Sequence, residues 1–158
     1  MNGVQGKAFR HFYVPRDSGA LSSVVGGEGV YRWDDAGRRY IDVTSGPVVC
    51  NLGHGNARVQ EAMAAQAKAA TFAWPLTFES EANRALAAAV TQAAGPGLER
   101  AFFVSGGSEA TETAIKFARQ VAVARGEELR AKVIGRHPSY HGGTLGAMAV
   151  SGDTAMDR

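Results

Sequence analysis

Residues 102–119 constrain the fold of this chain more than any other stretch. The stretch opens on the apolar run 101–104, which is typical of a short strand covered on both faces of a parallel sheet. Two glycines follow, and the apolar residues then recur with the period of a helix at Ala110, Ala114, Phe117, Ala118 and Val121. The pattern therefore predicts a strand, a glycine turn and a helix that begins at Ser108.

Such a unit is a favourable place to bind an anion, because the first amides of a helix lack partners and carry the positive end of its dipole. Gly106 and Gly107 allow a ligand to approach the backbone, and Ser108 could either cap the helix or donate its hydroxyl to a ligand oxygen. Glu109 and Glu112 would repel a phosphate, so we expect their side chains to point away from it. From spacing alone, a plain helix start with no ligand is an equal alternative.

Three motifs, in this order along the chain, resemble segments of the class III aminotransferases, which are pyridoxal-phosphate enzymes of fold type I. Residues 31–42 with 52–54 resemble the N-terminal region of that family. The sequence Phe-Val-Ser-Gly-Gly-Ser-Glu-Ala at 103–110 resembles its phosphate-binding segment, and residues 140–147 resemble its Tyr-His-Gly segment. Together the motifs cover nearly the whole chain.

The resemblance implies a cofactor, pyridoxal 5′-phosphate, and roles for four residues. Gly107 and Ser108 would bind its phosphate, and Tyr140 would stack on its ring. His141 would either orient the edge of the ring or only support the loop. No metal is expected.

Two further segments are candidates for the substrate pocket. The glycine-rich loop 44–56 carries no charge and is too irregular for a regular element, which favours a functional loop. The resemblance places Val48 against the substrate, and it lets Phe72 and Trp74 wall the pocket of a partner subunit. Alternatively, these rings seal the core of their own chain. We interpret His54 as structural rather than as a catalytic base.

Transamination requires a Schiff-base lysine and an acidic residue beside the pyridine nitrogen. The lysines of this chain fall on solvent-facing helix positions, at the start of a strand and in the N-terminal arm: Lys7, Lys68, Lys116 and Lys132. None is a credible Schiff-base residue, and the resemblance puts both required groups beyond Arg158. We therefore expect the N-terminal portion of an aminotransferase, with no catalytic residue of its own and no activity alone.

The expected architecture is α/β. Residues 1–56 would form an N-terminal arm, a hairpin at 30–33 and 39–43, and a loop at the active site and subunit interface. Residues 57–158 would form the first part of the cofactor-binding large domain, with helices capped by Asn56 and Ser80 and a βαβ crossover to a second strand at 132–135. Ligands on such sheets bind at the carboxyl ends of strands, where both resembling segments would emerge.

Composition excludes several other classes. With 158 residues the chain can bury a core of single-domain size. Its net charge of +2 comes without a basic block, which argues against nucleic acid, and it lacks the run of about 18 apolar residues that a membrane span needs. The single cysteine favours a reducing compartment, so cytoplasm is expected.

The expected partners are an amine or amino acid and a keto acid or aldehyde, with a homodimer for the full-length protein. Two alternatives stay open. Aminomutases and decarboxylases of the same fold share the N-terminal motifs, and a non-catalytic remnant could act as an interaction module through its exposed apolar helix faces.

Overall fold

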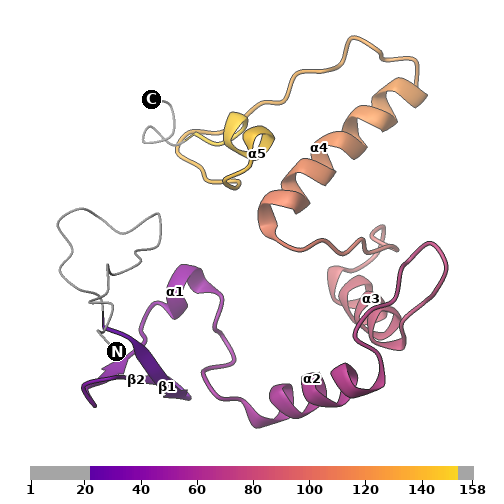
Figure 1. Ribbon diagram of the computed structural model, residues 1–158. Helices are drawn as coiled ribbons and strands as arrows, with labels where there is room; N and C mark the ends of the chain where they lie inside the picture. The colour runs from indigo at the N-terminus through magenta and orange to yellow at the C-terminus, as the bar shows by residue number, and fades with distance from the viewer. Residues whose placement is uncertain (1–21, 153–158) are drawn as a thin grey trace, which may run out of the picture. The chain divides into compact units, whose positions relative to one another are not determined.

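The computed structural model describes residues 22–152, whose helices and strands are drawn in Figure 1. The chain divides into two compact units. The first unit ends at Ala73 and the second begins at Trp74. The expected arm falls mostly on residues 1–21, which lie outside the described residues. The expected division at residues 56 and 57 stays a prediction.

The first unit contains a three-stranded antiparallel sheet in the order β1 (Val24–Glu28), β2 (Tyr31–Asp34) and β3 (Arg39–Ile41). The predicted hairpin is confirmed by β2 and β3, whose turn contains Gly37 at a φ of +75°. Glycine adopts this left-handed conformation without steric cost. The sequence did not indicate β1, because its two central glycines hide any alternation of apolar and polar residues.

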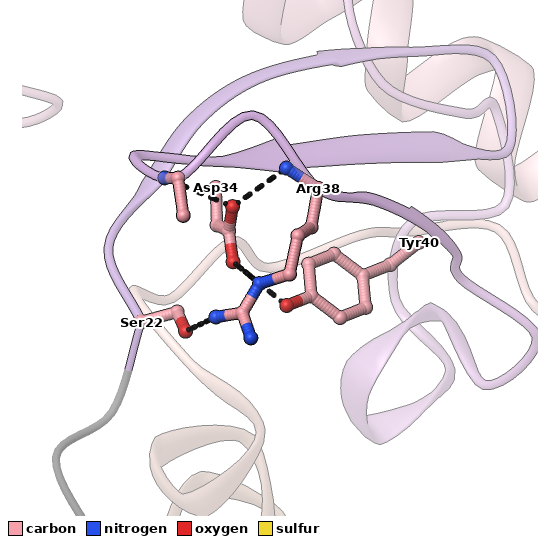
Figure 2. Close-up of polar contacts among 5 residues, drawn as sticks. Ser22, Asp34, Arg38 and Tyr40 are labelled. Atoms are coloured by element: carbon pink, nitrogen blue, oxygen red, sulfur yellow. Dashed lines mark hydrogen bonds and ion pairs between the residues drawn. The ribbon is translucent and has the colours of Figure 1, made fainter.

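A buried carboxylate holds the turn between β2 and β3 (Figure 2). Asp34 is 2% exposed, and its Oδ1 accepts hydrogen bonds from the amides of Ala36 and Arg38 at 3.1 and 2.9 Å. Its Oδ2 accepts from the Tyr40 hydroxyl at 2.7 Å and from Arg38 Nε at 2.8 Å, and the same guanidinium donates to Ser22. The Tyr40 hydroxyl first, and then the Arg38 amide and guanidinium, hold the pKa of Asp34 far below its usual range. Asp34 therefore stays ionised and fixes the turn.

Two helical segments follow in the first unit. The single turn α1 (Ser45–Val48) includes positive φ angles at Ser45 and Val48. The helix α2 (Ala57–Ala69) begins as expected, because Asn56 Oδ1 accepts a hydrogen bond from the amide of Val59 at 3.2 Å.

The second unit contains α3 (Glu81–Ala94), α4 (Gly107–Ala124) and α5 (Leu145–Ala149). Ser80 stands at the N-cap position of α3, although its side chain makes no capping hydrogen bond. The end of α4 at Gly126 is confirmed: this residue has a φ of +77° and donates to the carbonyl of Val123 at 2.9 Å. The start of α4 lies one residue before the predicted Ser108.

The α/β class is confirmed, but the expected parallel strands at 101–104 and 132–135 do not form. The described residues contain only the antiparallel sheet of the first unit. An apolar run becomes a strand only when a neighbouring strand accepts its hydrogen bonds. Neither run has such a neighbour among residues 22–152, so the βαβ crossover is absent from this part of the chain.

The expectation of a core of single-domain size is wrong for the described residues. Ala122 and Ala147 are the apolar residues that are buried there. The apolar faces of the three longer helices are instead open, with Met63, Leu86 and Phe117 at 68%, 50% and 65% exposure. An amphipathic helix buries its stripe only against another layer, and the described residues do not supply one for these faces.

Candidate functional site

The N-terminus of α4 presents unpaired backbone donors. The first amide bonded within the helix is that of Ala110, which donates to the carbonyl of Gly106 at 3.0 Å. Gly106 occupies the N-cap position and has no side-chain oxygen to cap the turn. In the described part of the chain, the amides of Gly107, Ser108 and Glu109 donate to no protein atom. The helix therefore begins with three free donors at the positive end of its dipole.

The two acidic residues of this turn accept hydrogen bonds from the protein's own amides. Glu109 Oε2 accepts from the amide of Ser105 at 2.8 Å, and Glu112 Oε1 accepts from the amide of Gly146 at 2.8 Å. A hydrogen bond with Thr144, followed by the one from Gly146, lowers the pKa of Glu112 below its ordinary value. Glu112 therefore supports the start of α5 as an ionised carboxylate.

The segment 140–143 lies against the first turns of α4. Thr111 Oγ1 donates to the carbonyl of His141 at 2.8 Å, and the amide of Gly143 donates to Ser108 Oγ at 3.0 Å. Between these bonds, Gly142 is buried with a φ of +134°, and a Cβ there would come within 2.8 Å of Ser108 Cα. Only glycine allows this approach. The two segments that the sequence predicted to converge therefore adjoin.

The four residues expected to bind the cofactor lie on these two adjoining segments. Gly107 and Ser108 open α4, while Tyr140 and His141 belong to the segment docked on it. The Tyr140 side chain is 65% exposed and so is free to cover a ligand. The backbone of His141 is held at both polar atoms, since its amide also donates to Ser151 Oγ at 2.9 Å. Their binding roles remain predictions.

The residues expected to shape the substrate pocket are exposed. Val48 and Phe72 belong to the first unit and Trp74 opens the second, with exposures of 74%, 80% and 54%. The alternative that Phe72 and Trp74 seal the core of their own chain is therefore wrong for the described residues. Their contribution to a substrate pocket remains a prediction.

Sequence reasoning missed three residues that dock the two segments: Thr111, Glu112 and Gly142. The signal was present, because Ser108, Thr111 and Glu112 follow the i, i+3, i+4 spacing of one polar helix face. A polar face at the start of an otherwise apolar helix indicates a polar partner, and the backbone of 141–146 is that partner.

His54 has the structural surroundings that we expected. Its amide and carbonyl pair with the carbonyl and amide of Gly29 at 2.8 and 2.9 Å, and its Nε2 lies 2.9 Å from Asp42 Oδ2. These contacts tie the loop 44–56 to the sheet of the first unit.

Two other kinds of structural feature are absent from residues 22–152. In that part of the chain, no helix combines the length and apolarity that a bilayer crossing needs. Likewise, these residues include no group of three or more acidic, histidine or cysteine side chains placed to hold a metal ion.

Comparison with known proteins identifies the family of this chain. Residues 13–158 match the family described as aminotransferase class-III. An uncharacterized aminotransferase of Bacillus subtilis, YodT, is 39% identical over 138 residues, which cover 87% of this chain and 31% of that protein. The acetylornithine aminotransferase of Oceanobacillus iheyensis is 38% identical over 125 residues, covering 79% of this chain and 31% of its own length.

The fold is likewise similar to solved transaminases. The crystal structure of a transaminase from the marine bacterium Virgibacillus superposes with a TM-score of 0.88 at 32% identity, covering 95% of this chain and 35% of that one. The chain thus spans about a third of the length of these proteins. Because the family match extends over most of its residues, the chain belongs to the class III aminotransferases.

Proposed function

We propose that this chain supplies the phosphate-binding and ring-stacking side of a pyridoxal 5′-phosphate site in an aminotransferase. The whole protein would move an amino group between an amine or amino acid and a keto acid or aldehyde. The observation that carries the proposal is the set of three free amides, at Gly107, Ser108 and Glu109, beside the docked segment that contains Tyr140.

The donors present fit a phosphate group. Ser108 Oγ accepts from the amide of Gly143, so its hydroxyl proton is free for a phosphate oxygen. Together with the three amides it offers four donors, and a hydrogen bond to a charged group contributes about 1.5–3 kcal/mol. The carboxylates of Glu109 and Glu112 already accept from the amides of Ser105 and Gly146, so the amides of residues 107–109 are left for a phosphate.

The remaining contacts orient the cofactor. Tyr140 would lie on one face of the pyridine ring, where stacking adds about 0.5–1.5 kcal/mol beyond burial. His141 would meet the edge of the ring or support its loop. When bound, the cofactor supplies an electron sink for reactions at the carbon that carries the amine.

The chemical step needs groups that this chain does not provide. The resemblance puts the Schiff-base lysine and the acidic partner of the pyridine nitrogen outside this chain, so this chain alone would not transfer amino groups. In the whole protein, a homodimer would bring Val48, Phe72 and Trp74 to the substrate pocket.

Calorimetric titration with pyridoxamine 5′-phosphate tests the site, because this form of the cofactor has no aldehyde to react with surface lysines. We expect binding that pyridoxamine, which lacks the phosphate, does not reproduce. Ser108→Ala should weaken binding by about 10- to 100-fold and Tyr140→Ala by about 2- to 10-fold. Ser80→Ala is the matched control, since Ser80 precedes α3 without a capping bond. Equal binding of pyridoxamine 5′-phosphate and pyridoxamine would contradict the assignment of the phosphate-binding site.

The reaction type has its own test. The full-length protein should transfer an amino group to pyruvate or 2-oxoglutarate. Release of carbon dioxide, or movement of the amino group within one substrate, would instead favour the decarboxylase or aminomutase alternative. The similar proteins described above are named aminotransferases or transaminases, which supports amino transfer.

A further inference from the structure

A second cluster of chemically active side chains lies in the first unit and includes none of the residues assigned to the cofactor. His54 stands at its centre: Nε2 is 2.9 Å from Asp42 Oδ2, and Nδ1 is 3.6 Å from Cys50 Sγ. Cys50 is the sole cysteine of the chain, and it is half-buried with a free thiol. Cys50, His54 and Asp42 are thus arranged in space as a nucleophile, a base and a group that orients the base.

The surroundings of Asp42 determine which nitrogen of His54 carries the proton. Asp42 also contacts Arg32 at 3.3 Å, and its Oδ1 accepts from the amide of Ser45 at 2.9 Å. The hydrogen bond to His54 first, and the Arg32 charge next, lower the pKa of Asp42, so this carboxylate accepts the Nε2 proton. In the neutral imidazole the other nitrogen then carries a lone pair. Nδ1 is therefore the acceptor that faces the S–H group of Cys50.

The backbone fixes the imidazole in this position. The hydrogen bonds between His54 and Gly29 hold its main chain, and Gly27 packs so closely on it that a Cβ there would lie 2.7 Å from His54 Cβ. The His54 side chain keeps 23% exposure, so a small reagent can reach the cluster. The sheet therefore holds His54 on one side, and the other side of the cluster is open to solvent.

We propose that Cys50 is a thiol-modification site that reacts with low-molecular-weight disulfides, with His54 as its base and Asp42 as the group that positions His54. In the step, the S–H proton passes to His54 Nδ1 and the sulfur attacks one sulfur of the disulfide. The S–S bond of the reagent breaks, a mixed disulfide forms on Cys50, and the other half leaves as a thiolate. The histidine proton then returns to solvent, so no further oxidant is required.

The test compares the thiol in the native chain with the same thiol in the unfolded chain. The probe is the neutral disulfide 4,4′-dithiodipyridine, whose released thiopyridone is followed by absorbance at about pH 7. A base at the sulfur accepts the S–H proton during the attack and so raises the rate above that of an unassisted thiol. We expect the native chain to react at least about fivefold faster than the chain in urea. A half-buried cysteine without a base would react more slowly when folded, and that result would overturn the proposal.

Variants separate the base from simple accessibility. His54→Gln should bring the native rate down to or below that of the unfolded chain, and Asp42→Asn should give an intermediate rate because the amide still accepts one hydrogen bond. His137→Gln, a histidine of the second unit, is the matched control and should leave the rate unchanged. Circular dichroism checks the folding of each variant, and the native-to-unfolded comparison stands even if one fails to fold. An unchanged rate in a folded His54→Gln chain would contradict the proposal.

Discussion

Replacement of Gly142 by alanine perturbs the contact on which the cofactor site depends. Gly142 has a φ of +134°, and a residue with a Cβ in the left-handed half of backbone space costs about 1–3 kcal/mol. The new Cβ would also lie 2.8 Å from Ser108 Cα, so the segment must move and the bond from Gly143 to Ser108 Oγ is lost, at a further cost of about 0.5–1.5 kcal/mol. The docked arrangement is disfavoured by about 1.5–4.5 kcal/mol in total.

The assay is calorimetric titration of the variant with pyridoxamine 5′-phosphate. Since only the docked arrangement presents Tyr140 and Ser108 together, we expect the dissociation constant to rise at least about tenfold. Gly143→Ala is the matched control, because a Cβ at Gly143 meets no atom within 4 Å and the amide that bonds to Ser108 is retained. Equal affinities for the two variants would refute the coupling of the 140–143 segment to the helix.

Three further predictions concern stability. The pKa of Glu112 lies below its ordinary value, mainly because of the hydrogen bond with Thr144. Glu112 therefore stabilises the fold fully above its ordinary pKa, and this contribution is lost as pH falls through the lower pKa of the folded state. Glu112→Gln should thus reduce the loss of thermal stability between about pH 6 and about pH 3. Asn56→Ala removes the cap of α2 and should destabilise this helix by about 1 kcal/mol, which would be detected as a loss of the helical circular dichroism signal. Gly126→Ala should cost about 1 kcal/mol through φ alone, since its Cβ would meet no atom within 4 Å; an unchanged melting temperature would argue against the observed end of α4.

Features that depend on neighbouring residues were predictable from the sequence. Asn56 and Gly126 mark a helix start and a helix end because their effects act within one turn, and the structure confirms both. The hairpin was likewise predictable, because Gly37 supplies the conformation that its turn requires. The buried cluster at Asp34 was not, since Asp34 accepts from Arg38 and Tyr40 beyond the turn, and Arg38 in turn donates to Ser22 before β1.

Features that depend on distant residues were harder to predict. The apolar runs 101–104 and 132–135 have strand composition, but hydrogen-bonded partners, and not composition, make a strand. For the candidate site, the period change at Ser108 indicated the helix start with its free amides, and the resemblance indicated Tyr140. The polar face that includes Thr111 and Glu112 indicated a polar partner, but their docking bonds join positions about thirty residues apart, so no local pattern identifies that partner.

The central claim is that the first amides of α4 bind the phosphate of the cofactor. The most direct measurement is the set of backbone amide chemical shifts during titration with pyridoxamine 5′-phosphate, with pyridoxamine as the comparison. We predict saturable shifts at Gly107, Ser108 and Glu109 for the phosphorylated ligand alone, with no change in the first turn of α3, which is also uncapped. Equal shifts in both helices, or none at these three residues, would contradict the account.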